Sequence, residues 1–226
     1  MLALVTGSGR CGTNSVAAWL DGQALPGGRR VTAAHESAWP EIVAALLARR
    51  EDVVEAALRG FAHDVEVSPY LALARRRPLP EVPLIGIVRD GRKSVRSGMT
   101  NGWYYNSKPN PGSWVRLQPR FPGDRFDRCC RFWAWTYRRL ERWGATIFRL
   151  EELVADPAAR GRLLDLLGLA PSDIPFPVRN QTEPDAEVDG PAHFPPYARW
   201  TAGQRDAFAR HCGRLMDRWY PGWREG

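Results

Sequence analysis

Lysine is scarce in this chain, and the chain has no single basic run. Lys93 and Lys108 are the only lysines among 32 Lys+Arg, which face 25 Asp+Glu and leave a net charge of +7. The basic residues are therefore nearly all arginines, which favour forked contacts to phosphate or sulfate. Because they are scattered through amphipathic stretches, most belong to a solvated surface, and we expect an anionic ligand and no nucleic-acid partner.

Long apolar runs and metal-ligand spacings are also missing. No run approaches the roughly 18 apolar residues of a membrane span, and Met1 is followed at once by a short apolar stretch without a charged leader. We therefore expect a cytoplasmic protein with no membrane span. Cys11, Cys129, Cys130 and Cys212 show neither metal-ligand spacing nor a framework of pairs, which predicts reduced thiols and no metal.

Short apolar runs alternate with helical patterns along the chain. The strand-like runs are Leu2 to Thr6, Arg30 to Ala34, His63 to Val67, Leu84 to Val88 and Thr146 to Leu150. The helical patterns between them are Ser15 to Leu20, Trp39 to Arg59, Tyr70 to Arg76, Lys93 to Met99 and Arg125 to Trp143. This alternation predicts an α/β fold with a mainly parallel central sheet of about five strands.

The part after the last strand-like run differs in composition. A helical pattern from Asp156 to Leu167, a Pro-rich segment from Pro171 to Pro196 and an amphipathic helix from Ala202 to Trp219 follow. The length of the whole chain suits one domain of residues 1–226, with a core of residues 1–157. The Pro-rich segment is either a functional cover, which we favour, or a flexible linker.

The stretch NGWYYNSKPNPGSW, residues 101–114, combines aromatic residues with Gly, Pro and Asn and predicts a loop. Its aromatic side chains are Trp103, Tyr104, Tyr105 and Trp114. They could line the site of a second substrate, or they could pack the loop onto the core.

A Gly-rich turn, GSGRCGTN (residues 7–14), separates the first strand-like run from the first helical pattern. Strand, turn and helix in this order place backbone N–H groups around a phosphate-sized anion. The pattern GxxxxGK[ST] is half matched, since Thr13 replaces its lysine and Asn14 its Ser/Thr. Without both groups the turn is poorly equipped for phosphoryl transfer from ATP. It still offers Arg10 and Ser15 to an anion, unless it is a turn with no ligand.

A second motif, IGIVRDGRKSVRSGM (residues 85–99), is a strand that ends at Arg89 and enters a helix carrying Ser97. Ligands of parallel sheets collect at the carboxyl ends of the strands. Arg89 and Ser97 could therefore converge on a second anion near the first.

Together these motifs resemble the sulfotransferases that use 3′-phosphoadenosine 5′-phosphosulfate. GSGRCGTNS is similar to their 5′-phosphosulfate loop, RDGRKSVRS to their 3′-phosphate motif, and FRLEELVADP (residues 148–157) to a segment after the last core strand of bacterial members. Cys11, Asn14 and Gly91 depart from the usual patterns. The resemblance implies a P-loop-like three-layer sandwich with a loop-rich lid that binds the sulfuryl donor without a metal.

The activity implied by the resemblance is transfer of a sulfuryl group to a hydroxyl, or less readily an amine, of a small-molecule, carbohydrate or natural-product acceptor. The implied donor-binding residues are Gly9, Arg10, Cys11, Gly12, Thr13, Asn14, Ser15, Arg89 and Ser97. The transition state spreads negative charge, for which Arg10 is the best-placed cation.

The acceptor must lose a proton to a base. VTAAHESAW (residues 31–39) places His35 and Glu36 after the second strand-like run. We expect Glu36 to be the base, with His35 as the second choice and a helix cap as the remaining interpretation. DVEVSPYL (residues 64–71) is similar to a substrate-side segment of the family and makes Glu66 and Ser68 candidate acceptor contacts, or else a strand end and an N-cap.

Two other function classes remain open from the sequence. One is a nucleotide or small-molecule kinase with a degenerate phosphate loop, against which the missing lysine counts. The other is a non-catalytic nucleotide-binding or nucleic-acid-binding module, which needs no base at Glu36. The acceptor and the oligomeric state are not predicted.

Overall fold

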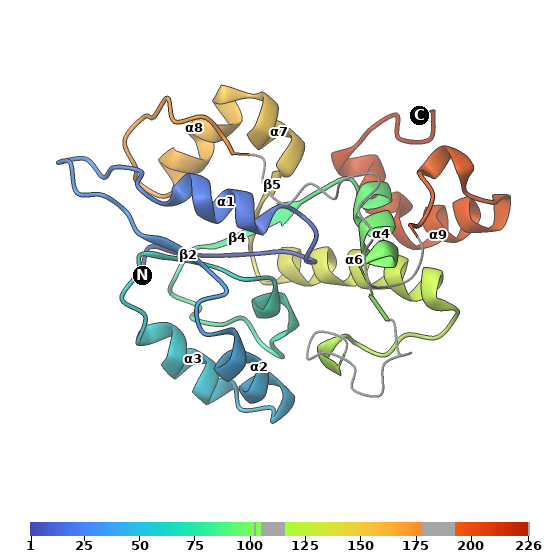
Figure 1. Ribbon diagram of the computed structural model, residues 1–226, viewed down its shortest axis with the longest axis horizontal. Helices are drawn as coiled ribbons and strands as arrows, with labels where there is room; N and C mark the ends of the chain where they lie inside the picture. The colour runs from blue at the N-terminus through green and yellow to red at the C-terminus, as the bar shows by residue number, and fades with distance from the viewer. Residues whose placement is uncertain (102, 105–115, 178–192, 226) are drawn as a thin grey trace.

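The computed structural model describes residues 1–101, 103–104, 116–177 and 193–225 and shows a five-stranded, all-parallel sheet (Figure 1). The strand order is β2-β3-β1-β4-β5. The strands are β1 (Ala3–Thr6), β2 (Ala33–His35), β3 (Val65–Val67), β4 (Leu84–Val88) and β5 (Thr146–Arg149). The predicted α/β class with a parallel central sheet is confirmed.

Helices cover both faces of the sheet. They are α1 (Thr13–Leu20), α2 (Trp39–Leu47), α3 (Glu51–Arg59), α4 (Gly91–Thr100), α6 (Arg125–Arg142), α7 (Leu150–Ala155), α8 (Pro157–Leu166) and α9 (Ala202–Trp219), with 3₁₀ turns η1 (Pro69–Leu73) and η2 (Tyr197–Arg199). In Figure 1, α1, α7 and α8 lie on one side of the sheet and α2, α3 and α6 on the other.

The central strand β1 shows how this three-layer arrangement is held together. Ala3 and Val5 pack into the core that includes α1 and α8, and Leu4 packs into the core that includes α2, α3 and α6. Alternate residues of a strand point to opposite faces, so a strand that is covered twice must be apolar throughout. All four residues of β1 are buried.

Four local predictions needed correction. The helical pattern from Trp39 to Arg59 is two helices, because the chain turns at Arg49, which has a φ of 60°. The strand expected from Arg30 to Ala34 is Ala33–His35, and the helix expected from Tyr70 to Arg76 is the 3₁₀ turn Pro69–Leu73. The helix Leu150–Ala155 was not expected, because no helical pattern was predicted between the strand-like run that ends at Leu150 and the helical pattern that begins at Asp156.

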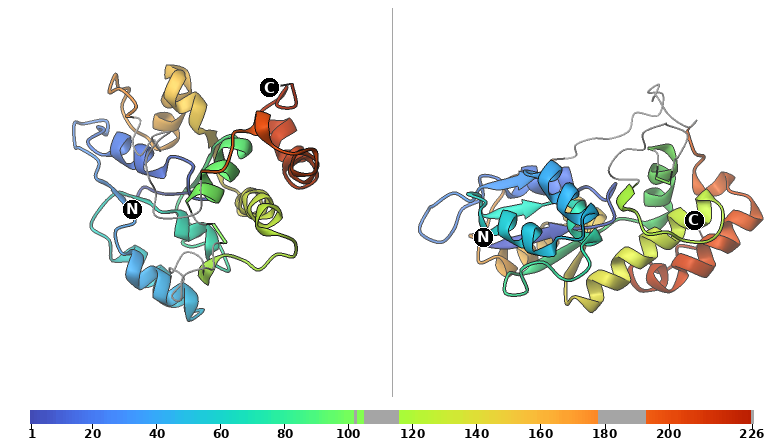
Figure 2. Two further views of the ribbon diagram at one scale, coloured as in Figure 1. Left: turned by 45° about the vertical axis from the view of Figure 1, so that its right-hand side comes forward. Right: turned by 90° about the horizontal axis from the view of Figure 1, so that it is seen from below.

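The C-terminal helix α9 packs against α6 and α4 at the end of the sheet where these helices gather (Figure 2). Trp200 contacts Phe208, and Phe208 contacts Trp223, with ring centroids 5.4 Å apart in each pair. All four cysteines are free and buried. None of the described helices is long and apolar enough to cross a membrane.

The described ends of the Pro-rich segment contact two different helices. On one side, Trp19 of α1 donates its indole N–H to the carbonyl of Ile174 at 3.0 Å. On the other side, Arg96 of α4 donates to the carbonyl of Phe194 at 3.0 Å. Residues 178–192, which the predicted cover includes, lie outside the described residues.

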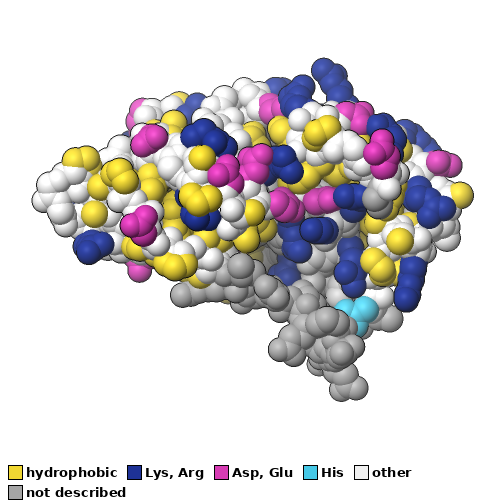
Figure 3. Space-filling view, turned by 90° about the horizontal axis from the view of Figure 1, so that it is seen from above, with side chains coloured by type: hydrophobic (Ala, Val, Ile, Leu, Met, Phe, Trp, Pro, Cys, Tyr) yellow, Lys and Arg dark blue, Asp and Glu magenta, His cyan; other side chains and the backbone are white. Residues whose placement is uncertain are grey.

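Charges of both signs share the face that carries α1, α7 and α8. Figure 3 shows basic and acidic side chains interspersed over it, with apolar side chains between them. This face therefore has the mixed charge of an ordinary solvated surface.

Candidate anion-binding and catalytic site

The Gly-rich turn connects β1 to α1 through a run of left-handed backbone. The φ angles are 72° at Gly9, 58° at Arg10 and 88° at Gly12. Gly12 is the N-cap of α1 and no side chain caps this helix. The first turn of a helix leaves backbone N–H groups without intrahelical acceptors, and these groups with the helix dipole favour an anion.

Close packing beneath the turn fixes its shape. A Cβ atom at Gly7 would lie 2.5 Å from Sγ of Cys11 and 2.7 Å from the carbonyl oxygen of Ile87, so a side chain does not fit there. Oγ of Ser8 lies 3.2 Å from the hydroxyl of Tyr137, which donates to the carbonyl of Ile87 at 2.8 Å. The turn is thus tied to β4 and α6 from below.

Cys11 belongs to this packing. Its side chain is fully buried, and burial raises the pKa of the thiol, so it stays protonated near neutral pH. A neutral thiol facing the interior fills space under the turn. Only the backbone of Cys11 can then serve an anion above it.

The two basic motifs meet above the turn. Arg10 donates from Nε to the hydroxyl of Ser97 on α4 at 3.1 Å, and Arg89 donates from Nη1 to the carbonyl of Arg10 at 3.2 Å. Burial, and then the positive charge of Arg89, lowers the pKa of Arg10, which nevertheless stays protonated. The structure therefore brings together the three side chains that the sequence assigned to neighbouring anion contacts.

No carboxylate of the described residues neutralises this pair of arginines. Within the described part of the chain, neither Arg10 nor Arg89 forms an ion pair with Asp or Glu. The nearby carboxylate of Asp90 binds Arg92 instead, at 2.8 Å, and also caps α4. Two half-buried positive charges that face each other are compensated best by an anionic ligand.

The structure explains why glycine stands at position 91. A Cβ atom at Gly91 would lie 3.1 Å from Sδ of Met216, 3.1 Å from Phe208 and 3.2 Å from Trp133. Helices α6 and α9 approach α4 so closely here that a Cβ atom would force one of these side chains to shift by a few tenths of an ångström. The departure at Gly91 therefore reflects packing beneath α4 and leaves Arg89 and Ser97 in place.

The candidate base lies at the end of β2, beside the turn. His35 ends the strand, and its Nε2 is 3.1 Å from Oγ1 of Thr13 on α1 and 3.8 Å from Oε1 of Glu36. Glu36 has a φ of 55°, an uncommon conformation for a residue with a side chain. Burial lowers the pKa of His35, so it is neutral near neutral pH.

Glu36 itself has the electrostatics of a base. Burial raises the pKa of its carboxyl, and the negative charge of Glu66 raises it further. A carboxylate whose pKa is raised towards the working pH holds a proton more tightly and is a stronger base. Of the two neighbouring groups, Glu36 is the one whose pKa is raised, and His35 the one whose pKa is lowered.

Glu66 and Ser68 lie inside the protein. Glu66 is 0% exposed, and its carboxylate accepts from the hydroxyl of Ser37 at 2.8 Å and lies 2.7 Å from Nε2 of His63. Burial raises its pKa, and the bonds to Ser37 and His63 oppose that rise. Ser68 is 1% exposed. Neither side chain is therefore placed to contact a ligand at the surface, and the charge of Glu66 raises the pKa of Glu36.

The aromatic loop residues divide into two groups. Trp103 is 1% exposed, and its ring contacts Phe132 with centroids 5.0 Å apart. Tyr104 donates its hydroxyl to the carbonyl of Pro119 at 2.8 Å. These two residues pack the loop onto the core, the second of the two sequence interpretations. Tyr105 and Trp114 lie outside the described residues.

The remaining loop residues occupy the start of α1. Thr13 and Ser15 are buried, and Asn14 is partly exposed. Sequence reasoning missed Trp39 and Tyr70, which lie next to the candidate base, and Tyr137, which supports the turn. The sequence did hold a signal for Trp39: it lies three positions after Glu36, which follows the second strand-like run, and begins the next helical pattern.

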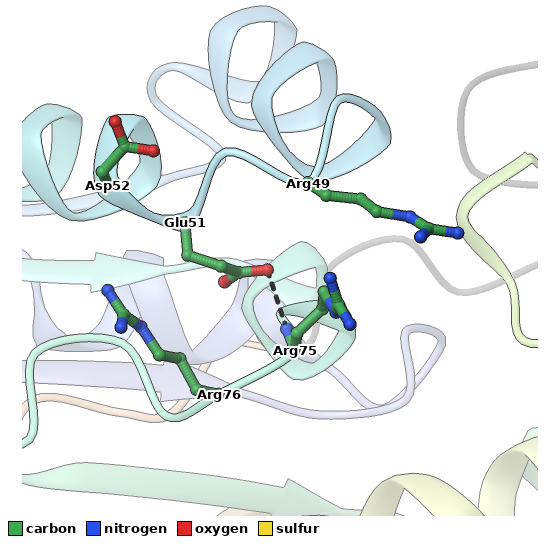
Figure 4. A pocket seen from close by; sticks show the side chains of 5 residues that line it. All are labelled: Arg49, Glu51, Asp52, Arg75 and Arg76. Carbon is green, nitrogen blue, oxygen red and sulfur yellow. Dashed lines mark hydrogen bonds between the residues drawn. The ribbon is translucent and has the colours of Figure 1, made fainter.

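A separate surface depression lies at the junction of α2 and α3. It is lined by Arg49, Glu51, Asp52, Arg75 and Arg76 and encloses about 470 Å³ (Figure 4). Several of these side chains already have partners: the carboxylate of Glu51 accepts from the backbone N–H of Arg75 at 3.0 Å, and Asp52 and Arg76 form ion pairs with Arg50 and Glu55, which do not line the depression. None of the residues of the Gly-rich turn line it, so we do not place the site there.

Among the described residues, no group of three or more His, Cys, Asp or Glu side chains could hold a metal ion. Comparison of the sequence with protein-family models and with curated proteins finds no match to either.

Proposed function

We propose that this chain is a sulfotransferase that uses 3′-phosphoadenosine 5′-phosphosulfate as its donor. The observation that carries the proposal is the convergence of Arg10, Arg89 and Ser97 above the uncapped start of α1, with no carboxylate among the described residues to neutralise the arginines. A ligand with two anionic groups on one nucleoside matches this arrangement.

Each anionic group of the donor has its own set of contacts in this proposal. The backbone of residues 9–13 and Arg10 hold the 5′-phosphosulfate at the helix start. Arg89 and Ser97 hold the 3′-phosphate. The donor, when bound, supplies the activated sulfuryl group, and the protein contributes position and positive charge.

The chemistry assigns distinct tasks to Arg10 and Glu36. The acceptor oxygen forms a bond to sulfur as the bond between sulfur and the bridging phosphate oxygen breaks, and Glu36 accepts the proton of the acceptor hydroxyl. Arg10 stabilises the negative charge that develops on the leaving oxygen and the sulfonate. Thr13, 3.1 Å from His35, keeps the neutral imidazole beside Glu36.

The kinase interpretation finds less support in the same residues. Thr13 stands at the lysine position of the nucleoside triphosphate loop, and its hydroxyl contacts His35. Asn14 stands where a Mg²⁺-binding Ser/Thr would be. Transfer from a triphosphate would need both functions.

The direct test is transfer of ³⁵S-labelled sulfonate from the donor to a panel of sugars and phenols. Glu36→Gln should lower kcat by about 10²- to 10⁴-fold, because the general base is lost, and should leave binding of adenosine 3′,5′-bisphosphate unchanged. Glu41→Gln, a matched change at an exposed position of α2, should leave both unchanged. Equal turnover in the wild type and Glu36→Gln would remove Glu36 as the base, and absence of transfer with every acceptor would count against the activity.

A further inference from the structure

Among the tryptophans that the structure describes, Trp39 is the one that is exposed. It is 45% exposed, and it is the sole aromatic residue among the large apolar side chains that are exposed in the described chain. Trp19, Trp133 and Trp200, by contrast, are buried. Exposure of a tryptophan costs free energy that a ligand could recover, so its position relative to the base is informative.

Trp39 is fixed close to Glu36 by the backbone. It is the first residue of α2, and its N–H donates to the carbonyl of Glu36 at 3.2 Å, which closes a tight turn between β2 and the helix. The indole therefore begins one turn away from the candidate base and stays near it as long as that turn is intact.

A second ring extends the surface. Tyr70 lies in η1, which follows β3, the strand beside β2. Its ring stacks against that of Trp39, with centroids 6.5 Å apart and planes 18° from parallel. Burial raises the pKa of the Tyr70 hydroxyl, and the charge of Glu36 raises it further, which places the phenol within electrostatic range of that carboxylate.

The residues that lead to Trp39 are polar. His35 and Glu36 are partly exposed and Ser37 is exposed. A flat aromatic acceptor would bury its rings and leave such groups without partners, whereas a sugar presents C–H groups on one face and hydroxyls around its edge. The combination of an exposed indole and a polar rim fits a pyranose.

We propose that Trp39 and Tyr70 form the acceptor subsite and hold a pyranose ring of a carbohydrate so that one of its hydroxyls faces Glu36. This inference rests on the proposed function, and it names the acceptor class and two residues that recognise it. Trp39 contributes the stacking surface, and Tyr70 keeps the indole in place from the neighbouring strand end.

The test measures binding apart from chemistry. Saturation-transfer NMR would follow chitotetraose, cellotetraose and 2-naphthol in the presence of the protein and adenosine 3′,5′-bisphosphate. We expect at least one tetrasaccharide to bind, Trp39→Ala to raise its Kd about tenfold, and Trp39→Phe to restore part of the loss. Trp143→Ala removes another partly exposed tryptophan, at the opposite end of the sheet before β5, and should have no effect.

Each result decides a separate question. Unchanged sugar binding in Trp39→Ala, preferential binding of 2-naphthol, or no binding of either tetrasaccharide would overturn the acceptor proposal. Bisphosphate binding by every variant shows that the fold and the donor site are intact. If the wild type itself does not bind adenosine 3′,5′-bisphosphate, the proposed function is refuted, independently of Trp39.

Discussion

The pairing of Arg10 with Arg89 predicts an unusual response to removal of one charge. Arg89→Gln would lose a hydrogen bond from a charged donor to the carbonyl of Arg10, which contributes about 1.5 to 3 kcal/mol. It would also relieve repulsion between two like charges, which is of the order of 1 to 4 kcal/mol for close charges near a protein surface. Because the two effects oppose each other, we expect the unliganded stability to change by less than about 3 kcal/mol.

The liganded protein should respond very differently. Bisphosphate at 100 times its Kd stabilises the wild type by about 2.7 kcal/mol, which raises the Tm of a chain of this size by about 5 to 11 °C. If Arg89→Gln weakens binding about 100-fold, the same concentration stabilises by only about 0.4 kcal/mol and raises Tm by about 1 to 2 °C.

The assay is a thermal melt of both proteins with and without adenosine 3′,5′-bisphosphate. Arg75→Gln, in the depression of Figure 4, is the control for loss of one exposed positive charge and should keep the full ligand response. A variant Arg89→Gln that is strongly destabilised without ligand yet shows the wild-type ligand shift would refute the reasoning. Arg89 would then be a structural residue.

Four further predictions concern the turn and the base. Because Glu66 raises the pKa of Glu36, Glu66→Gln should shift the acidic limb of the kcat/KM profile to lower pH, and an unshifted limb would show that the two charges are uncoupled. The raised pKa values of Glu36 and Glu66 mean that the folded state holds the protons of these two carboxyl groups more tightly than the unfolded chain does. The free energy of unfolding that the two groups contribute should therefore rise as the pH falls from neutral towards about 4.3, as measured by urea unfolding at each pH. Gly12→Ala should cost about 1 to 3 kcal/mol and abolish bisphosphate binding, since φ is 88° and a Cβ would lie 2.6 Å from Leu150; Leu150→Ala in the same chain should restore stability in part if this contact is the cause. Cys11 should react with a thiol reagent only after unfolding, and labelling of the native protein at Cys11 would contradict its burial.

The sequence predicted the sheet because its signal is local. Buried parallel strands are continuous apolar runs, and all five runs correspond to strands of the structure, although that at Arg30 to Ala34 is displaced towards His35. The break between α2 and α3 was missed because Arg49, with its left-handed backbone, carries no glycine or proline signal. Tertiary packing decides where a helix breaks at a residue such as Arg49, and a single sequence carries no record of that packing.

The candidate site divides in the same way. Arg10, Arg89 and Ser97 could be expected to lie together because their strands are parallel and their carboxyl ends share an edge of the sheet. The direction of individual side chains could not be predicted from the sequence: Trp103 and Glu66 are buried, whereas Trp39 is exposed. Which aromatic residue faces solvent depends on the helices packed against it.

The central claim is that the turn and the Arg89–Ser97 pair bind two anionic groups of one nucleotide. Calorimetric titration of the protein with adenosine 3′,5′-bisphosphate and, separately, with ATP and Mg²⁺ tests it most directly. We predict that the bisphosphate binds at least roughly 100-fold more tightly, since only it offers a 3′-phosphate to Arg89 and Ser97. ATP with Mg²⁺ binding as tightly as the bisphosphate, or more tightly, would contradict the account.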